Sequence, residues 1–246
     1  LKSQDEYLKF VFLTGVSKFA KVSIFSGLNN LKDISMDNRF ASLCGYTQDE
    51  LERIFKEYID LYAEFNSGYK FTNRDELLQV IKNWYNGYRF TESEIKVYNP
   101  FSTLLLFDTK QFTGHWFATG TPKFLLDIIE EQNYSEVAKF ENLYVEKSDL
   151  EKFDFDNFHI PSILYQTGYQ TIRETRGTGF ILDYPNKEVS TAFIKELLDR
   201  FTKRSSEISS DNLYKLTEAI KSYDLNLFFS VFKSYPHLQD LADRLI

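Results

Sequence analysis

The sequence has a single cysteine and no long apolar run, and each of these absences limits what the protein does. Among its 246 residues only Cys44 is a cysteine, which excludes an internal disulfide and a zinc site built on cysteines. Its apolar neighbours predict that Cys44 is a small buried residue rather than a nucleophile. No apolar run approaches the roughly 18 residues that cross a bilayer, and no signal peptide is visible. We therefore expect a cytoplasmic protein with no membrane partner.

The groups that build common active sites are also missing. The sequence contains no Gly-x-x-x-x-Gly-Lys-Ser/Thr loop, which binds phosphates in P-loop enzymes. Its three histidines, His115, His159 and His237, are widely spaced and have no partner pattern, so each is predicted to be an ordinary surface or core residue. A catalytic triad and a metal cluster are likewise not found. No catalytic or metal-binding residue is therefore assigned, and a stand-alone enzyme has the least support.

Positive charge is in deficit, whereas aromatic residues are abundant. The chain has 29 Lys and Arg against 36 Asp and Glu, a formal net charge of −7. This balance argues against nonspecific duplex binding by the whole surface and leaves room for a local basic patch. The 24 Phe and 16 Tyr predict packed helices with tyrosines at their edges. The length suffices for one large domain or two small ones.

An apolar run near the start of the chain ends abruptly in polar residues. Phe10–Leu13 is followed by Thr14, Gly15, Ser17 and Lys18. This pattern is typical of a buried parallel strand that presents polar groups at its carboxyl edge. Open α/β sheets bind ligands outside that edge. A single strand does not make such a sheet, and few further strands follow.

Helix start signals recur through the middle of the chain. Thr47 with Glu50 forms a capping-box pattern and predicts a helix that ends near Asn66. Thr72 or Asn73 caps a second helix, which stops at residues 86–87. Pro residues in a first helical turn predict two more helices, after residues 99 and 121.

The pattern of predicted elements changes after residue 158. Residues 160–167 read as a short helix, and segments 170–172 and 180–182 alternate as strands around a glycine-rich turn. A long helix follows from Pro185 to about residue 203. Helix, hairpin and helix in this order are the outline of a winged-helix unit. Two or three further helices, from about residues 209, 224 and 236, complete the chain.

Seven phrases occur together and in order between residues 10 and 189. They are FLTGVSK (12–18), IFSGLNNL (24–31), WYNGY (84–88), YNPFS (98–102), WFATGTP (116–122), LYQTGY (164–169) and YPNKEV (184–189). Together they closely resemble the AAA-ATPase-like family of bacterial and archaeal proteins. In that family a predicted P-loop ATPase region usually precedes a domain of the PD-(D/E)xK nuclease superfamily. The resemblance fades after about residue 203.

The resemblance implies a mainly helical α+β fold with four regions. They are a remnant of the ATPase core with its sensor strand (1–34), a helical lid-like region (35–157), a winged-helix-like unit with a short hairpin (158–205) and connecting helices (206–246). The phosphate loop and the acidic strand that orders magnesium would lie upstream, and the nuclease-like domain downstream. No cofactor is therefore expected in this chain alone, and ATP and magnesium are expected only together with the upstream region.

The resemblance also implies nucleotide-contacting positions. Thr14 resembles the first sensor of such ATPases, whose hydroxyl bonds the γ-phosphate or the attacking water; the alternative is a strand-end threonine that caps a turn. Lys18 would reach toward phosphate or be an ordinary solvated lysine. The segment 120–122 resembles the start of the lid helix beside the adenine, or is an ordinary helix start. The predicted nucleotide-binding residues are Thr14, Ser17, Lys18, Gly120, Thr121 and Pro122.

The winged-helix-like unit has a second interpretation, as a nucleic-acid-binding module. Arg173, Arg176 and Lys187 are the candidate phosphate contacts. Acidic residues in the same segment nearly cancel this charge, which favours an intramolecular or protein-contact role. The preferred function is therefore the regulatory and interaction portion of an AAA-ATPase-like protein. Its expected partners are other domains of its own full-length protein or a separate protein.

Overall fold

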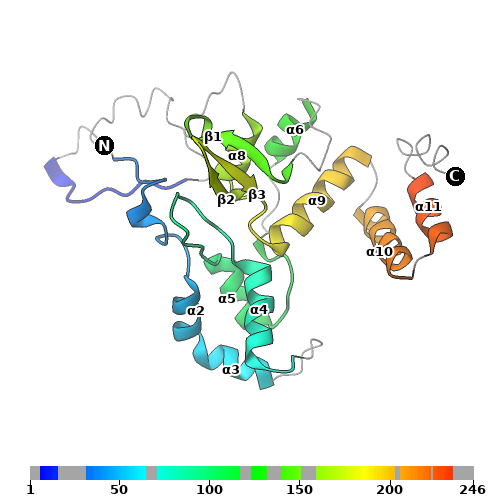
Figure 1. Cartoon of the computed structure of the whole chain (residues 1–246). Helices are drawn as coiled ribbons and strands as arrows, with labels where there is room; N and C mark the ends of the chain where they lie inside the picture. Colours follow the sequence, from blue (N-terminus) through cyan, green and yellow to red (C-terminus); the bar gives the residue numbers. More distant parts are fainter. Residues whose placement is uncertain are drawn as a thin grey trace. The chain divides into compact units, whose positions relative to one another are not determined.

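A computed structural model of the chain combines helices with one small antiparallel sheet (Figure 1). It describes residues 6–15, 32–64, 71–116, 123–131, 140–150, 159–202, 206–222 and 224–234. The mixture confirms the α+β class. The chain divides into two compact units, Leu1–Ala192 and Phe193–Ile246.

Helices account for most of the described elements. In the first unit they are η2 (Asn38–Phe40), α2 (Gln48–Ile54), α3 (Lys56–Glu64), α4 (Arg74–Tyr85), α5 (Pro100–Thr109), α6 (Lys123–Glu131), α7 (Lys147–Leu150) and α8 (Ile160–Gln166). Helix α9 (Lys187–Thr202) contains the division between the units. The second unit adds α10 (Ser206–Ser222) and α11 (Leu225–Lys233).

The helix starts lie where the capping residues predict them. The Thr47 hydroxyl accepts a bond from the Glu50 amide at 3.3 Å, and the Glu50 carboxylate accepts one from the Thr47 amide at 2.9 Å. Asn73 caps α4 by accepting from the Glu76 amide at 2.8 Å. Asn99 caps α5, whose first turn contains a proline. These side chains satisfy amides that a helix leaves without partners at its start.

The prediction of a single helix after Thr47 is wrong in one respect, because the observed helix is broken at Phe55. Helix α2 ends at residue 54 and α3 begins at residue 56. The Phe55 ring stacks on Phe107, with centroids 4.9 Å apart, and meets the edge of Tyr46 at 5.2 Å. Aromatic contacts made across the bundle therefore accompany the break, and the local helical pattern does not show them.

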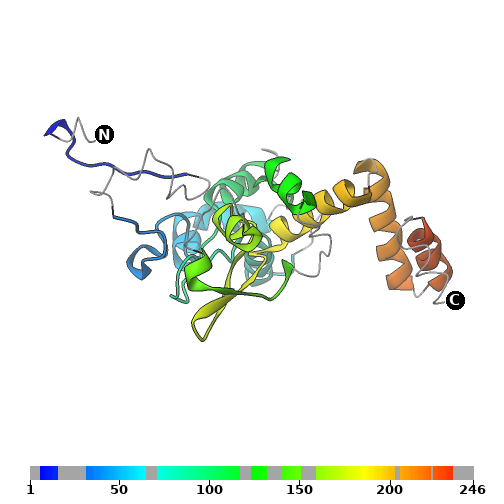
Figure 2. The same ribbon diagram turned by 90° about the horizontal axis from the view of Figure 1, so that it is seen from above.

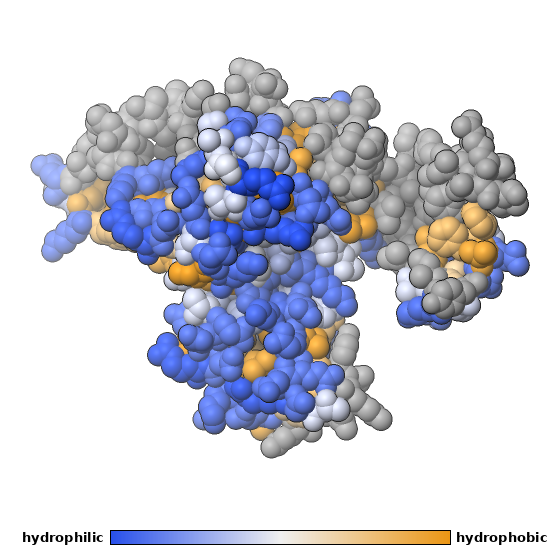
Figure 3. Space-filling model, in the orientation of Figure 1, coloured by the Kyte–Doolittle hydropathy of each residue, from blue (hydrophilic) through white to orange (hydrophobic). Residues whose placement is uncertain are grey.

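The core of the helical bundle is rich in aromatic side chains. Its buried members are Leu51, Phe55, Ile59, Tyr62, Leu77, Leu78, Ile81, Tyr85, Tyr98, Leu106, Phe107 and Phe112. The hydroxyl of Tyr62 donates to the Lys110 carbonyl at 2.8 Å, and that of Tyr85 donates to the Thr113 carbonyl at 3.0 Å. Buried tyrosines thus keep their polar ends satisfied. Outside this core, Figure 3 shows a mainly hydrophilic bundle face with small hydrophobic patches.

The three strands form an antiparallel sheet in the order β1-β3-β2. They are β1 (Leu143–Glu146), β2 (Thr171–Arg176) and β3 (Gly179–Asp183). The β2–β3 hairpin confirms the predicted pair of strands. Its turn contains Gly177 with φ of +59°, and the hairpin projects from the neighbouring helices (Figure 2). Strand β1 was not expected from the sequence. Its Val145 shares a small core with Leu150 and Ile172.

The strand predicted at Phe10–Leu13 is wrong for this structure. The described residues 6–15 contain no strand, and Phe10 is 81% exposed, Phe12 53% and Leu13 48%. A strand needs a neighbour for its backbone N–H and C=O groups. No described strand pairs with this segment, since all three strands belong to the β1-β3-β2 sheet. An apolar run alone therefore did not produce a buried strand.

In the second unit, α10 and α11 pack side by side (Figure 1). They match the helices expected from about residues 209 and 224, while the one expected near 236 lies outside the described residues. Ala219 and Val231 are buried, and the Asn212 amide lies 3.3 Å from the Ser234 hydroxyl. Within the described parts of the chain, no helix has both the length and the apolar character to span a membrane.

Candidate functional site

The predicted nucleotide-binding residues are not gathered by the structure. Thr14 is exposed and does not end a strand. Ser17, Lys18, Gly120, Thr121 and Pro122 lie outside the described residues. Contact of these six positions with a nucleotide stays a prediction.

The three basic residues proposed for nucleic acid all have local partners. Arg173 Nη1 lies 2.9 Å from the Asp183 carboxylate, and Arg176 Nη2 lies 3.1 Å from that of Glu174. The Lys187 ammonium sits 4.7 Å from the centre of the Trp84 ring, in cation–π contact. Exposed ion pairs are weak, so they do not lock these side chains. They do reduce the positive potential that the segment offers to a phosphate backbone.

Cys44 is exposed, so the prediction of a buried cysteine is wrong. It lies in the turn that precedes Tyr46, which bridges to Tyr98. Turn side chains commonly face solvent even when their neighbours in sequence are apolar. Among the residues that the structure describes, no three His, Cys, Asp or Glu side chains gather as metal ligands.

A buried arginine, Arg89, joins the helical bundle to the sheet, and no motif in the sequence marks it as a site residue. The Arg89 side chain is 1% exposed. Its guanidinium donates to the carbonyls of Ser93 and Glu92, both at 2.7 Å, and to that of Arg173 at 3.2 Å. The Arg89 amide also donates to the Thr171 hydroxyl at 2.7 Å. These bonds compensate the burial of its charge and fix β2 against the chain that follows α4.

A second buried charged residue, Glu188, lies at the start of α9. It is 1% exposed, and its Oε1 accepts bonds from the Ser102 hydroxyl at 3.0 Å and the Trp116 amide at 2.8 Å. Burial raises the pKa of this carboxyl, although the two bonds oppose the shift. Glu188 Oε2 has no hydrogen-bond partner in the described structure, and neither has the buried Tyr88 hydroxyl. Burial and the nearby Glu188 carboxylate raise the pKa of Tyr88.

Five of the seven phrases meet around Glu188. A Cβ added to Gly87 would lie 1.9 Å from the Pro185 carbonyl, so these two backbones touch. One added to Gly168 would contact both Trp116 and Tyr88 at 3.7 Å. Trp116 also packs on Tyr169, with ring centroids 5.1 Å apart. We call the set of the buried Tyr88, Ser102, Tyr169 and Glu188 and the half-buried Trp116 the motif junction.

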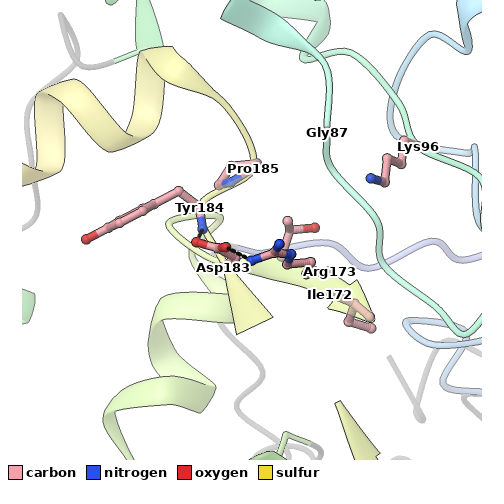
Figure 4. Close-up of a pocket in the computed structure, with 8 residues that line it drawn as sticks. Gly87, Lys96, Ile172, Arg173, Asp183, Tyr184 and Pro185 are labelled. Atoms are coloured by element: carbon pink, nitrogen blue, oxygen red, sulfur yellow. Dashed lines mark hydrogen bonds and ion pairs between the residues drawn. The ribbon is translucent and has the colours of Figure 1, made fainter. Parts of the chain in front are cut away.

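A small polar pocket lies beside the motif junction. Its volume is about 210 Å³, and Gly87, Lys96, Thr171, Ile172, Arg173, Asp183, Tyr184 and Pro185 line it. In Figure 4 the Lys96 ammonium turns toward the other lining residues, and the Arg173–Asp183 pair forms the opposite side. The pocket therefore holds two cations and one carboxylate, and that carboxylate is already paired.

Comparison with known proteins gives one informative relative. A protein of Azotobacter chroococcum mcd 1, described as "Uncharacterized protein in vnfD 5'region", is 37% identical over 244 residues. The match covers 96% of this chain and 44% of that protein, so the chain spans less than half the length of its relative. No family model matches the chain, and no solved structure matches it.

Proposed function

We propose that this chain is the regulatory and interaction portion, with sensor, lid and winged helix, of an AAA-ATPase-like protein. The order of the seven phrases supports this proposal, as does a relative more than twice as long as the matched segment. In the whole protein, ATP and magnesium would bind upstream residues. The helices α2–α6 would then serve as the lid, and closure would pass the bound state to an effector such as a nuclease-like domain.

The connectivity of the sheet supports a winged helix within this chain. The elements β1, α8, β2 and β3, with the strand order β1-β3-β2, match the strand connectivity of a winged helix, whose first strand would lie before the boundary expected at residue 158. In this reading α8 takes the place of the recognition helix, and the β2–β3 hairpin is the wing.

The burial of α8 is the observation that favours a protein-contact role over nucleic-acid binding. The helix reads IPSILYQ and carries no charged residue. Ile160 to Leu164 are buried, the Tyr165 hydroxyl donates to the Phe90 carbonyl at 2.7 Å, and the Gln166 amide donates to the Leu150 carbonyl at 3.2 Å. A recognition helix needs a free polar face for the major groove. In this chain that face is used for internal packing.

Two binding experiments test the proposal. The 246-residue chain should show neither micromolar affinity for labelled ATP nor its turnover, whereas a longer protein that includes the upstream region should bind ATP. Binding and turnover by the short chain would refute the assignment of the phosphate site to missing parts.

Duplex DNA binding tests the alternative role of the wing. We expect weak affinity with little dependence on salt, and little change when Arg173, Arg176 and Lys187 are replaced by Glu. Tight binding that falls steeply with salt and is lost in this triple variant would instead establish a nucleic-acid module.

A further inference from the structure

We propose that the pocket beside the motif junction binds a single small oxyanion, of the phosphate or carboxylate type, between Lys96 and Arg173. This proposal does not depend on the ATPase-like assignment. Three charged side chains line the cavity of about 210 Å³: one lysine, one arginine and the carboxylate of Asp183.

Asp183 is already occupied by its neighbours. Its Oδ2 lies 2.9 Å from Arg173 Nη1, and its Oδ1 accepts the Tyr184 amide at 2.8 Å. Its charge is therefore compensated, and the pocket as a whole has one positive charge in excess. A cation would find no second carboxylate among the lining residues, whereas an anion finds two donors.

The donors that face the pocket have hydrogens to spare. Arg173 uses only Nη1 for its bonds to Asp183 and Asn142, and no described residue accepts a hydrogen bond from its Nε or Nη2. Lys96 forms no ion pair with any described residue. A guanidinium has five N–H donors and an ammonium three, so both side chains retain donors for an oxyanion.

The backbones of two lining segments touch at Gly87 and Pro185. Gly87 has φ of +111°, and its missing Cβ makes room for the Pro185 carbonyl. Lys96 comes from the segment after α4, whereas Arg173 and Asp183 come from the hairpin strands. An anion held by both cations would therefore link the bundle segment to the wing.

The test is a titration of the full chain with inorganic phosphate, in which NMR measures the chemical shifts of the backbone amides of Gly87 and Thr171. Sodium chloride at matched ionic strength serves as the reference. Separate titrations with acetate and a nucleoside monophosphate distinguish a carboxylate from a free or nucleotide phosphate. We expect saturable shifts confined to the pocket amides with at least one of these oxyanions and none with chloride.

Three variants predict effects of different sign. Lys96→Gln should weaken binding about tenfold, the loss of one charge-assisted hydrogen bond. Asp183→Asn keeps an acceptor for the Tyr184 amide but removes the charge that competes for Arg173, so it should tighten binding severalfold. Lys82→Gln is the matched control, because Lys82 is exposed and does not line the pocket. It should leave the dissociation constant within about twofold.

Circular dichroism and melting temperature of each variant verify that it folds. Equal losses for Lys96→Gln and Lys82→Gln would show general charge screening and overturn the proposal. So would weaker binding by Asp183→Asn, or pocket amides that do not respond to any oxyanion.

Discussion

The buried carboxyl of Glu188 provides the sharpest test of how this fold is held together. Replacing Glu188 by Ala removes the acceptor for the Ser102 hydroxyl and the Trp116 amide. Each buried donor left without a partner costs about 1–3 kcal/mol, so the two together predict a loss of about 2–6 kcal/mol in the free energy of unfolding. A loss of this size is a large fraction of the stability of a typical domain.

Glu188→Gln separates the hydrogen bonds from the ionisable group. The amide oxygen still accepts both bonds, so at acidic pH this variant should stay within about 1 kcal/mol of the wild type. Burial raises the pKa of Glu188 in the folded state, which therefore favours the protonated acid. The contribution of this group is fully present below the unfolded pKa of about 4.3 and is lost as the pH rises through the higher folded pKa. The wild type should therefore lose stability relative to Glu188→Gln over that interval.

Urea unfolding of the two proteins between pH 4 and pH 8 measures this difference. Effects of other titrating groups are common to both proteins and cancel in the comparison. Glu174→Gln is a suitable control, since Glu174 is exposed and pairs only with Arg176 in the described structure. Its effect should stay below about 1 kcal/mol. A pH-independent gap between wild type and Glu188→Gln, or a cost for Glu188→Ala as small as that of the control, would refute the reasoning.

Three further substitutions, one of them with a matched control, test the bonds of Arg89, the close approach at Gly87 and the exposure of Phe12. Arg89→Met removes the donor for three backbone carbonyls and should cost about 3 kcal/mol in urea unfolding; a cost below 1 kcal/mol would contradict its role as a link. Gly87→Ala should cost more than about 2 kcal/mol because it drives a Cβ into the Pro185 carbonyl at positive φ, whereas Gly114→Ala, with open space around it, should change stability by less than about 0.5 kcal/mol. Phe12→Ser should leave the melting temperature unchanged because this ring is 53% exposed; a clear decrease would show that it is buried after all.

Local signals in the sequence predicted much of the fold. Thr47, Asn73 and Asn99 begin helices because each satisfies amides within its own first turn. The hairpin around Gly177 was likewise readable, since its turn needs a residue with positive φ. In these cases the determining contacts lie within a few residues of each other.

Contacts between distant segments explain what the sequence did not reveal. Strand β1 has only four residues and exists because β3 pairs with it across more than thirty positions. The apolar run at Phe10–Leu13 shows the reverse, since a good strand pattern stays exposed where the described chain provides no partner strand. The site residues follow the same rule. In the sequence, Glu188 is marked only by its place in the phrase YPNKEV. Its buried hydrogen bonds join it to Ser102 and Trp116, which lie 86 and 72 positions away.

The composition of the phrases has a physical explanation in the motif junction. An apolar junction would tolerate small shifts between segments, because apolar contacts have little direction. Glu188 instead needs a hydroxyl from α5 and the amide of Trp116 at fixed positions, and Gly87 must approach Pro185 without a side chain. Polar groups buried in this way define one arrangement of the segments at some cost in stability. A part that transmits the state of one domain to another needs such a defined arrangement. The junction therefore suits the proposed regulatory role better than an apolar core of the same size.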